Sequence, residues 1–251
     1  MSATGPRYDT IGDGYAAHRR PDPRIAAAVH AAFGGARTVL DVGAGSGSYE
    51  PTDRPVVALE PSRTMHAQRP PDAGPVVEGV AEGLPFASGS FDAAMAILTH
   101  HHWTDVDRGF AEIRRVARRV VVLTWDPDAV RAANLWLARD YFPDLHGDLY
   151  VEPALPEARR AFPGATVVPV PIPHDCTDGF MAAYWARPEA YLDAGVRGAI
   201  SSFARRDPAV LGPGLARLRA DLASGAWAAR NADLRGRVSL DLGYRLLVAD
   251  W

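Results

Sequence analysis

The sequence of 251 residues contains no lysine, one cysteine and no long apolar run. Because all 27 basic side chains are arginine, mechanisms that need a lysine amine are excluded. The single Cys176 cannot form an internal disulfide. No apolar segment approaches the roughly 18 residues of a membrane span, and the N-terminus lacks the profile of a signal peptide. We therefore expect a soluble, cytoplasmic protein.

The charged side chains are nearly balanced, with 27 basic and 30 acidic residues and a formal net charge of -3. Such a balance gives no overall field that would recruit nucleic acid or a membrane surface. The chain, of which 47% is hydrophobic, suffices for one α/β domain with an insertion. We expect a small-molecule acceptor as partner, and the sequence indicates neither an oligomeric state nor a protein partner.

The most informative stretch is an apolar run followed by alternating glycines. Residues 38–42 are largely β-branched and apolar apart from Asp41, which predicts a strand buried on both faces. Glycine at every second position, in Gly43, Gly45 and Gly47, lets the backbone turn sharply and approach a ligand. The dinucleotide fingerprint would need glycine at position 48, which is serine. The stretch therefore predicts a cofactor loop for which pyrophosphate is not the first candidate ligand.

A second strand is expected at residues 56–59, and it leads into Glu60. Doubly wound folds that bind nucleosides hold the ribose hydroxyls with a carboxylate about 20 residues after the glycine loop. Glu60 lies near that offset, so it is the candidate for ribose binding.

Two later segments carry a family resemblance. Residues 82–86 read Glu-Gly-Leu-Pro-Phe, and residues 90–92 read Ser-Phe-Asp within the start of a small apolar strand. With the glycine loop, they resemble the class I S-adenosylmethionine (SAM) dependent methyltransferases. The resemblance is to the small-molecule branch that contains the ubiquinone and menaquinone C-methyltransferases, and it covers roughly residues 8–126.

The resemblance implies a Rossmann-like α/β fold with a mostly parallel seven-stranded sheet, helices on both faces and a helical cap insertion. Further strands are expected at residues 75–79, 91–98, 118–125, 165–172 and 240–248, the last two as an antiparallel pair. A helix is expected at 129–140. We expect an N-terminal arm and helix at 1–35, a SAM-binding core at 36–173, the cap at 174–238 and the final strand at 239–251.

SAM is the cofactor that the resemblance implies. Asp41 and the glycine loop would lie near its amino acid part. The N-terminal arm would lie over it, with Tyr15 and Arg20 near the methionine carboxylate and Arg19 as a weaker candidate for the same role. Arginine suits this role because it meets a carboxylate with two parallel charge-assisted hydrogen bonds.

The adenine side of the expected site departs from the family pattern. Relatives commonly have an aspartate that accepts from the adenine amino group, and Val80 stands at that position here. The backbone of Ala81 or the side chain of Glu82 would then contact the adenine.

Three adjacent histidines follow the fourth expected strand. Ligands bind beyond the carboxyl ends of parallel strands, so this run lies where donor and acceptor should meet. Successive side chains on a strand point to opposite faces, so at most His100 and His102 converge. We expect one of them to be a general base, with a structural or positioning role as the alternative. No metal is expected, because no carboxylate or cysteine partner is fixed by spacing.

The acceptor is expected to contact residues from the histidine segment and from the cap. The candidates are His101, Trp103, Asp175 and Tyr184.

Methyl transfer from SAM to a small metabolite, in natural-product biosynthesis, is the first functional hypothesis. The alternative is a methyltransferase fold that works as a cyclase or eliminase, with SAM absent or only structural, because a fold does not fix a function. A non-catalytic partner subunit is less favoured, since the glycine loop and Glu60 are intact.

Overall fold

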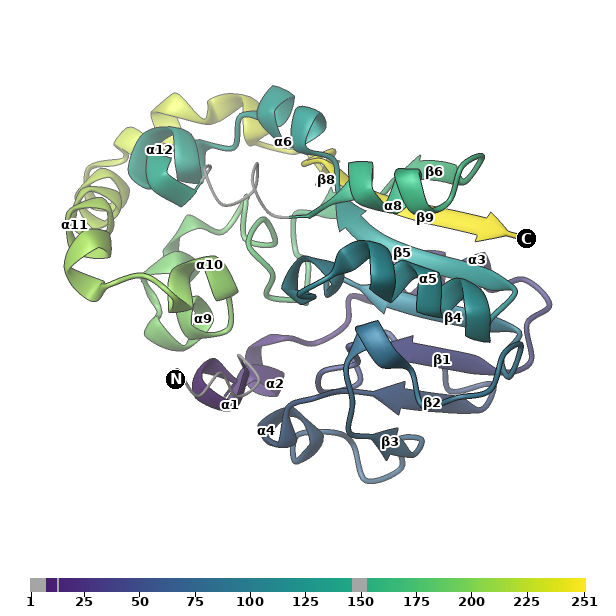
Figure 1. The fold of residues 1–251 in the computed structure, drawn as a ribbon. Coiled ribbons are helices and arrows are strands. Elements are labelled where there is room, and N and C mark those ends of the chain that lie inside the picture. The colour runs from purple at the N-terminus through teal and green to yellow at the C-terminus, as the bar shows by residue number, and fades with distance from the viewer. Residues whose placement is uncertain (1–7, 13, 146–152) are drawn as a thin grey trace.

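The computed structural model describes residues 8–12, 14–145 and 153–251, and within them seven strands form one sheet. The strand order is β3-β2-β1-β4-β5-β9-β6 (Figure 1). The strands are β1 Val39–Val42, β2 Val56–Leu59, β3 Val76–Val77, β4 Ala93–Ile97, β5 Arg119–Trp125, β6 Thr166–Pro169 and β9 Tyr244–Asp250. β9 runs antiparallel to both of its neighbours, and the other pairings are parallel. The expected mostly parallel seven-stranded sheet is confirmed.

Helices cover both faces of this sheet, as predicted. The helix α3 (Pro23–Ala32) lies behind the sheet in Figure 1, while α5 (Val106–Val116) and α8 (Leu155–Ala161) lie in front. Because side chains alternate along a strand, Val121 and Leu123 pack in the cluster that contains α3, and Val120 and Val122 pack in the cluster that contains α5. The β-branched residues of β5 are therefore buried on both faces of the sheet.

The helical cap follows β6 and precedes β9 in the chain. It contains η4 Pro188–Leu192, α9 Ala194–Gly198, α10 Ser201–Ala204, α11 Pro208–Ser224, α12 Ala226–Arg230 and η5 Ala232–Leu234. The strands β7 (Ile172–Pro173) and β8 (Ser239–Leu240) form a short antiparallel pair where the chain enters and leaves the cap. Apolar side chains of the cap belong to the same buried cluster as α3. The cap is thus packed into the core and does not form a core of its own.

The predicted helix at 129–140 is divided. It forms α6 (Pro127–Ala133), which ends at Asn134 in the left-handed region, and the π-helix η3 (Leu137–Tyr141). Between them, Trp136 donates from Nε1 to the carbonyl oxygen of Trp185 at 2.8 Å. Residues 134–145 therefore pack with the cap, whose expected range of 174–238 stays a prediction.

The N-terminal arm consists of α1 (Tyr8–Ile11) and α2 (Tyr15–His18), beside α4 (Arg63–His66) in Figure 1. Gln68 holds the arm by donating to the carbonyl oxygen of Gly12 at 2.7 Å. Two 3₁₀ turns, η1 (Ala81–Gly83) and η2 (His100–His102), complete the edge of the sheet where the arm lies. In the described ranges, no helix has the length and apolarity to cross a membrane.

Candidate active site

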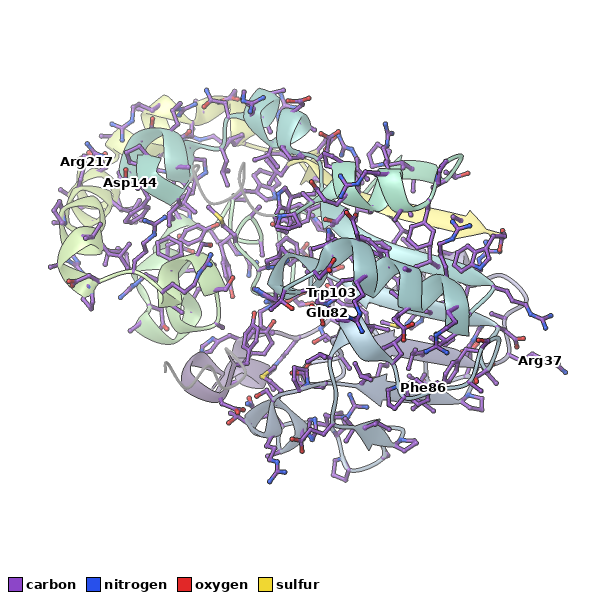
Figure 2. The ribbon with its side chains drawn as sticks, viewed as in Figure 1. Arg37, Glu82, Phe86, Trp103, Asp144 and Arg217 are labelled. Atoms are coloured by element: carbon purple, nitrogen blue, oxygen red, sulfur yellow. The ribbon has the colours of Figure 1, made fainter. Side chains whose placement is uncertain are left out.

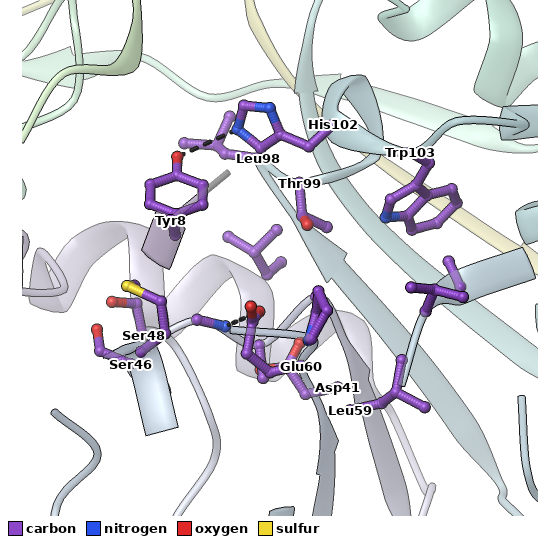
Figure 3. Close-up of a pocket in the computed structure, with 18 of the residues that line it drawn as sticks. Tyr8, Asp41, Ser46, Ser48, Leu59, Glu60, Leu98, Thr99, His102 and Trp103 are labelled. Atoms are coloured by element: carbon purple, nitrogen blue, oxygen red, sulfur yellow. Dashed lines mark hydrogen bonds between the residues drawn. The ribbon is translucent and has the colours of Figure 1, made fainter. Parts of the chain in front are cut away.

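A cavity of about 710 Å³ opens at the carboxyl ends of β1, β2 and β4 (Figure 3). This edge is the switch point of the sheet, because β1 lies between β2 and β4. Nine of the residues expected to bind a ligand line this main cavity: Tyr15, Asp41, Gly43, Gly45, Glu60, Ala81, Glu82, His102 and Trp103. The arm, the glycine loop and the histidine turn therefore meet around one space.

The glycine loop follows β1 in a conformation that requires glycine. Gly43 has a φ of +74°, and a Cβ there would lie 2.0 Å from Oγ1 of Thr99. The amides of Gly43 and Ala44 both donate to the carbonyl oxygen of Leu59, at 2.8 and 3.1 Å. Gly47, which was also expected to bind the cofactor, turns the chain at a φ of +87° but does not line the main cavity.

Glu60 lies on the cavity wall with 5% of its surface exposed. One carboxylate oxygen accepts from the amide of Gly45 at 2.8 Å, and the other accepts from the amide of Ser62 at 2.9 Å. Burial raises the pKa of the carboxyl group, against the effect of these hydrogen bonds. A carboxylate has about four lone-pair positions, so each oxygen keeps one for a ligand hydroxyl.

Asp41 lies in β1, two residues before Gly43, and it is 1% exposed. Its Oδ2 has no hydrogen-bond partner among the described residues. Burial and the nearby Glu50 raise its pKa, even though Glu50 is itself paired with Arg69 at 2.8 Å. An unpartnered buried polar atom is costly, so this oxygen is a candidate to accept a hydrogen bond from a ligand.

The adenine side of the expected site is less polar. Val80 is 50% exposed on the cavity wall. Glu82 lies next to Trp103 (Figure 2), and its Oε1 already accepts from the amide and hydroxyl of Thr104 at 2.6 and 2.8 Å. Burial would raise the pKa of Glu82, but these hydrogen bonds and that from Asp105 lower it overall. Glu82 therefore holds the turn after η2 and remains only a proposed adenine contact.

The arm presents Arg19 to the main cavity, whereas Arg20 is exposed and does not line it. The structure therefore brings Arg19, the weaker candidate, to the cavity in place of Arg20, because the chain after α2 turns Arg19 inward. Arg19 donates from Nε to Asp178 and from Nη1 to the hydroxyl of Tyr15, both at 2.6 Å.

Asp178 and Tyr49 are site residues that the sequence analysis missed. Asp178 is 1% exposed and accepts from Arg19 and from the hydroxyl of Tyr49, the latter at 2.8 Å. Backbone contacts reinforce the pairing, since Arg19 forms a β-bridge with Asp178 and Gly179 donates to the carbonyl oxygen of His18 at 3.0 Å. An acidic residue before a glycine, as in Asp178 and Gly179, is typical of many turns. The sequence around Asp178 therefore did not indicate a functional residue.

The histidines form a 3₁₀ turn, because β4 ends at Ile97. The expectation that at most His100 and His102 converge assumed a strand, and the structure does not bring both side chains to the cavity. His100 is fully buried and donates from Nε2 to the carbonyl oxygen of Ala154 at 3.1 Å. Burial lowers its pKa to about 4. It does not line the cavity, so it is no longer a candidate base.

His102 does line the main cavity, and its Nε2 lies 3.1 Å from the hydroxyl of Tyr8 (Figure 3). The ring of His101 lies against that of His102, with centroids 3.7 Å apart, and His101 lines a neighbouring cavity of about 60 Å³. The described residues contain no group of three or more histidine, cysteine or acidic side chains able to hold a metal ion.

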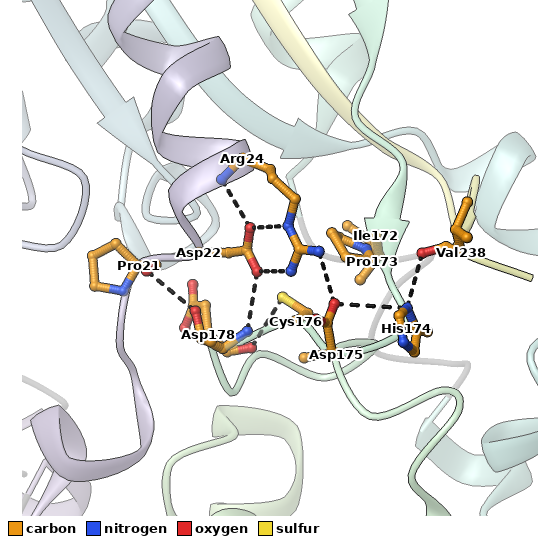
Figure 4. A network of polar contacts seen from close by, with 12 residues as sticks. Pro21, Asp22, Arg24, Ile172, Pro173, His174, Asp175, Cys176, Asp178 and Val238 are labelled. Atoms are coloured by element: carbon orange, nitrogen blue, oxygen red, sulfur yellow. Dashed lines mark hydrogen bonds and ion pairs between the residues drawn. The ribbon is translucent and has the colours of Figure 1, made fainter.

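The two acceptor contacts expected in the cap lie elsewhere. Asp175 is exposed and pairs with Arg24 at 2.7 Å in the network of Figure 4. Tyr184 packs against Tyr191 and Arg187 and lines none of these cavities. The structure therefore brings neither residue to a cavity, because Asp175 is exposed and Tyr184 packs in the buried core cluster.

Comparisons with known proteins agree with this geometry. A methyltransferase-domain family model matches residues 40–123. A protein of Anabaena variabilis ATCC 29413, assigned as a methyltransferase from an antibiotic biosynthesis pathway, is 33% identical, with a TM-score of 0.86. The match covers 93% of this chain and 99% of that protein.

Two more distant proteins were also matched. A SAM-dependent methyltransferase of Thermotoga maritima is 22% identical over 66% of this chain and 84% of its own, with a TM-score of 0.51, which shows the fold alone. Protein YafE of Escherichia coli K12 is 32% identical over 63 residues. That match spans 24% of this chain and 30% of the curated relative.

Proposed function

Because this chain belongs to the class I SAM-dependent methyltransferases, we propose that it methylates a small metabolite in natural-product biosynthesis. The A. variabilis relative, assigned to an antibiotic biosynthesis pathway, supports the biosynthetic part of the proposal. The observation that carries it is the main cavity of about 710 Å³, into which the glycine loop and the buried Glu60 both face.

The residues around this cavity fit the cofactor of the family. Glu60 keeps acceptor positions for two ribose hydroxyls. Asp41 has an unpartnered buried oxygen that would accept from the amino group of the methionine part. Arg19 would approach the methionine carboxylate. When bound, SAM supplies an activated methyl group, and S-adenosylhomocysteine is the second product.

The chain itself has little chemistry to perform beyond orientation, since holding an acceptor in line supplies most of the acceleration. We assign the base role to His102. An acceptor hydroxyl in place of that of Tyr8 would meet the same nitrogen, Nε2. Nε2 of His102 would take the proton of the acceptor hydroxyl, which would leave its oxygen as the nucleophile.

Titration calorimetry with S-adenosylhomocysteine tests the cofactor site. Glu60→Gln should weaken binding by about one to two decades, because hydrogen bonds to a charged carboxylate contribute about 1.5–3 kcal/mol. The matched control is Glu78→Gln, which removes an exposed acid paired with Arg63 and should leave the affinity unchanged. If the wild-type protein does not bind at millimolar ligand, the proposed function is wrong.

His102→Gln tests the base. We expect a loss of about 10²- to 10⁴-fold in methylation rate with little change in S-adenosylhomocysteine affinity. Product formation without SAM, and without added methyl mass, would instead support a cyclase or eliminase.

A further inference from the structure

The main cavity adjoins a smaller cavity on the side of the cap. Its neighbour of about 60 Å³, which we call the cap cavity, shares Tyr8, Arg19 and Leu98 with it. A third cavity of about 30 Å³ shares Trp125, Met181 and Tyr244 with the cap cavity. The three spaces therefore form a row that leads from the histidine turn into the cap. A ligand that extends away from the cofactor would follow this row.

The walls of the cap cavity are mainly apolar and aromatic. Phe180 and Tyr244 have ring centroids 4.7 Å apart, and the ring of Trp125 lies 4.8 Å from that of His101. Aromatic walls of this kind favour a flat ligand that can pack edge-to-face or offset against them.

The positive charge in the wall of the cap cavity is neutralised by an ion pair. Arg19 is the cationic residue of the cap cavity, and its guanidinium is paired with the buried Asp178 at 2.6 Å. Of the described residues that line the cap cavity, none is acidic. An ammonium group would find no counter-charge, and a second carboxylate, beside that of the cofactor, would have to compete with Asp178 and the cofactor for Arg19. A neutral ligand fits best, because burying an unpaired charge is costly.

Met181 lies between the two small cavities together with Trp125 and Tyr244, and it is the only one of these three with an unbranched aliphatic side chain. Its backbone is held, because the hydroxyl of Tyr191 donates to its carbonyl oxygen at 2.6 Å. Its thioether has a weak partner in the hydroxyl of Ser202 at 3.5 Å. Methionine is unbranched and adapts to irregular spaces. The side chain of Met181 therefore sets how far the cap cavity extends.

Building on the proposed function, we propose that the cap cavity binds a neutral aromatic acceptor and that Met181 determines its length. A cavity of about 60 Å³ is smaller than the roughly 150 Å³ that accommodates benzene, so one ring would lie partly in the main cavity. A second fused ring would need the space that Met181 occupies. Met181 is thus a specificity-determining residue, and the preferred acceptor carries one ring with a hydroxyl that reaches His102.

Calorimetry on protein saturated with S-adenosylhomocysteine tests this, with phenol and 2-naphthol as probes. The wild-type protein should bind phenol more tightly than 2-naphthol, and 2-naphthoate more weakly than either. Met181→Ala should improve 2-naphthol binding at least about tenfold and change phenol binding little, because each additional buried carbon contributes to affinity. Met181→Phe should abolish 2-naphthol binding and retain phenol.

The conservative control is Met181→Leu, which should behave as wild type. Each variant should bind S-adenosylhomocysteine within about twofold of wild type, which shows that it is folded. If it does so and the ratio of phenol to 2-naphthol affinity is the same in Met181→Ala and Met181→Phe as in wild type, the inference is overturned while the proposed function stands. Failure of the wild-type protein to bind S-adenosylhomocysteine overturns both.

Discussion

The Arg19–Asp178 pair joins the arm to the cap, and both side chains are buried, with exposures of 11% and 1%. Removing one partner of a buried pair leaves an uncompensated charge, which costs about 3–5 kcal/mol. We therefore expect Arg19→Met and Asp178→Asn each to lower the free energy of unfolding by about that amount. The double variant should lose less than the sum.

Urea unfolding of the three variants measures this coupling. Arg63→Met is the control, because it breaks an exposed pair with Glu78 and should change stability by less than about 1 kcal/mol. Strictly additive losses for Arg19 and Asp178 would show that the two groups do not stabilise each other.

His100 makes the stability of the protein depend on pH. Its native pKa is about 4, whereas the ordinary histidine value is 6.5. Between these values the unfolded chain binds a proton and the native state does not, so stability falls as the pH is lowered through this window. The contribution present above pH 6.5 is about 3 kcal/mol.

The variant His100→Gln should therefore flatten the dependence of unfolding free energy on pH between about 6.5 and 4. The exposed His174→Gln should retain the wild-type slope. A His100→Gln profile parallel to that of wild type would assign the acid sensitivity to other groups.

A site residue could be predicted from the sequence only where its neighbours along the chain indicated its position. The positions of Gly43, Gly45 and Glu60 at the main cavity could be predicted, because each follows the end of a strand that the sequence itself indicates. Arg20 was chosen over Arg19 because the arm has no apolar period that tells inward from outward. Asp178 acquires its role only through a contact 159 residues away from Arg19, and no local pattern encodes such a pairing.

At the scale of elements, the conformation of the loop after β1 depends on Thr99, which follows β4 and packs against Gly43. Gly43→Ala would force a side chain into a left-handed conformation, at a cost of about 1–2 kcal/mol, and push its Cβ against Thr99. We expect lower stability and weaker S-adenosylhomocysteine binding, measured by urea unfolding and calorimetry.

Adding Thr99→Ala to this variant should restore part of the stability, because it removes the Oγ1 atom that the new Cβ meets. Gly35→Ala is the control, since nothing lies within 4 Å of a Cβ there. Unchanged ligand affinity in Gly43→Ala would mean that the loop does not approach the cofactor.

Long elements were easier to predict than short ones. The strands β1, β4 and β5 are buried on both faces, and their apolar runs can be recognised in the sequence. The strand β3 has only two residues, which is too short for such a pattern. The histidine segment was misread because Leu98 adopts a φ of +50°, which ends the strand before the histidines. The conformation of Leu98 depends on its surroundings in the fold, so the sequence of this segment alone does not predict where the strand ends.

For the whole molecule, the shared cluster of cap and α3 predicts one cooperative unfolding transition. Cap residues such as Phe180, Trp185 and Phe203 lie in the same buried cluster as Ile25 and Val29. Differential scanning calorimetry should give a single peak whose calorimetric and van't Hoff enthalpies agree. Two resolved peaks would mean that the cap unfolds as a separate unit.

The helix α2 of the arm has no buried residue, and the arm is expected to respond to ligand. Tyr8, Tyr15 and Arg19 line the main cavity, so a bound cofactor would add contacts to all three. Hydrogen exchange of residues 14–20 should slow when S-adenosylhomocysteine is added. Equal exchange with and without ligand would show that the arm does not close over the site.

The packing of cap and α3 into one cluster also bears on how a ligand leaves. A swing of the cap would expose that cluster to water, whereas the arm can move once the Arg19–Asp178 pair and the backbone contact from Gly179 to His18 break. Product would then depart past the arm, and its residence time would depend on how long these contacts last. Variants that weaken them would shorten that residence time, so turnover would rise wherever product release, and not methylation, limits the rate.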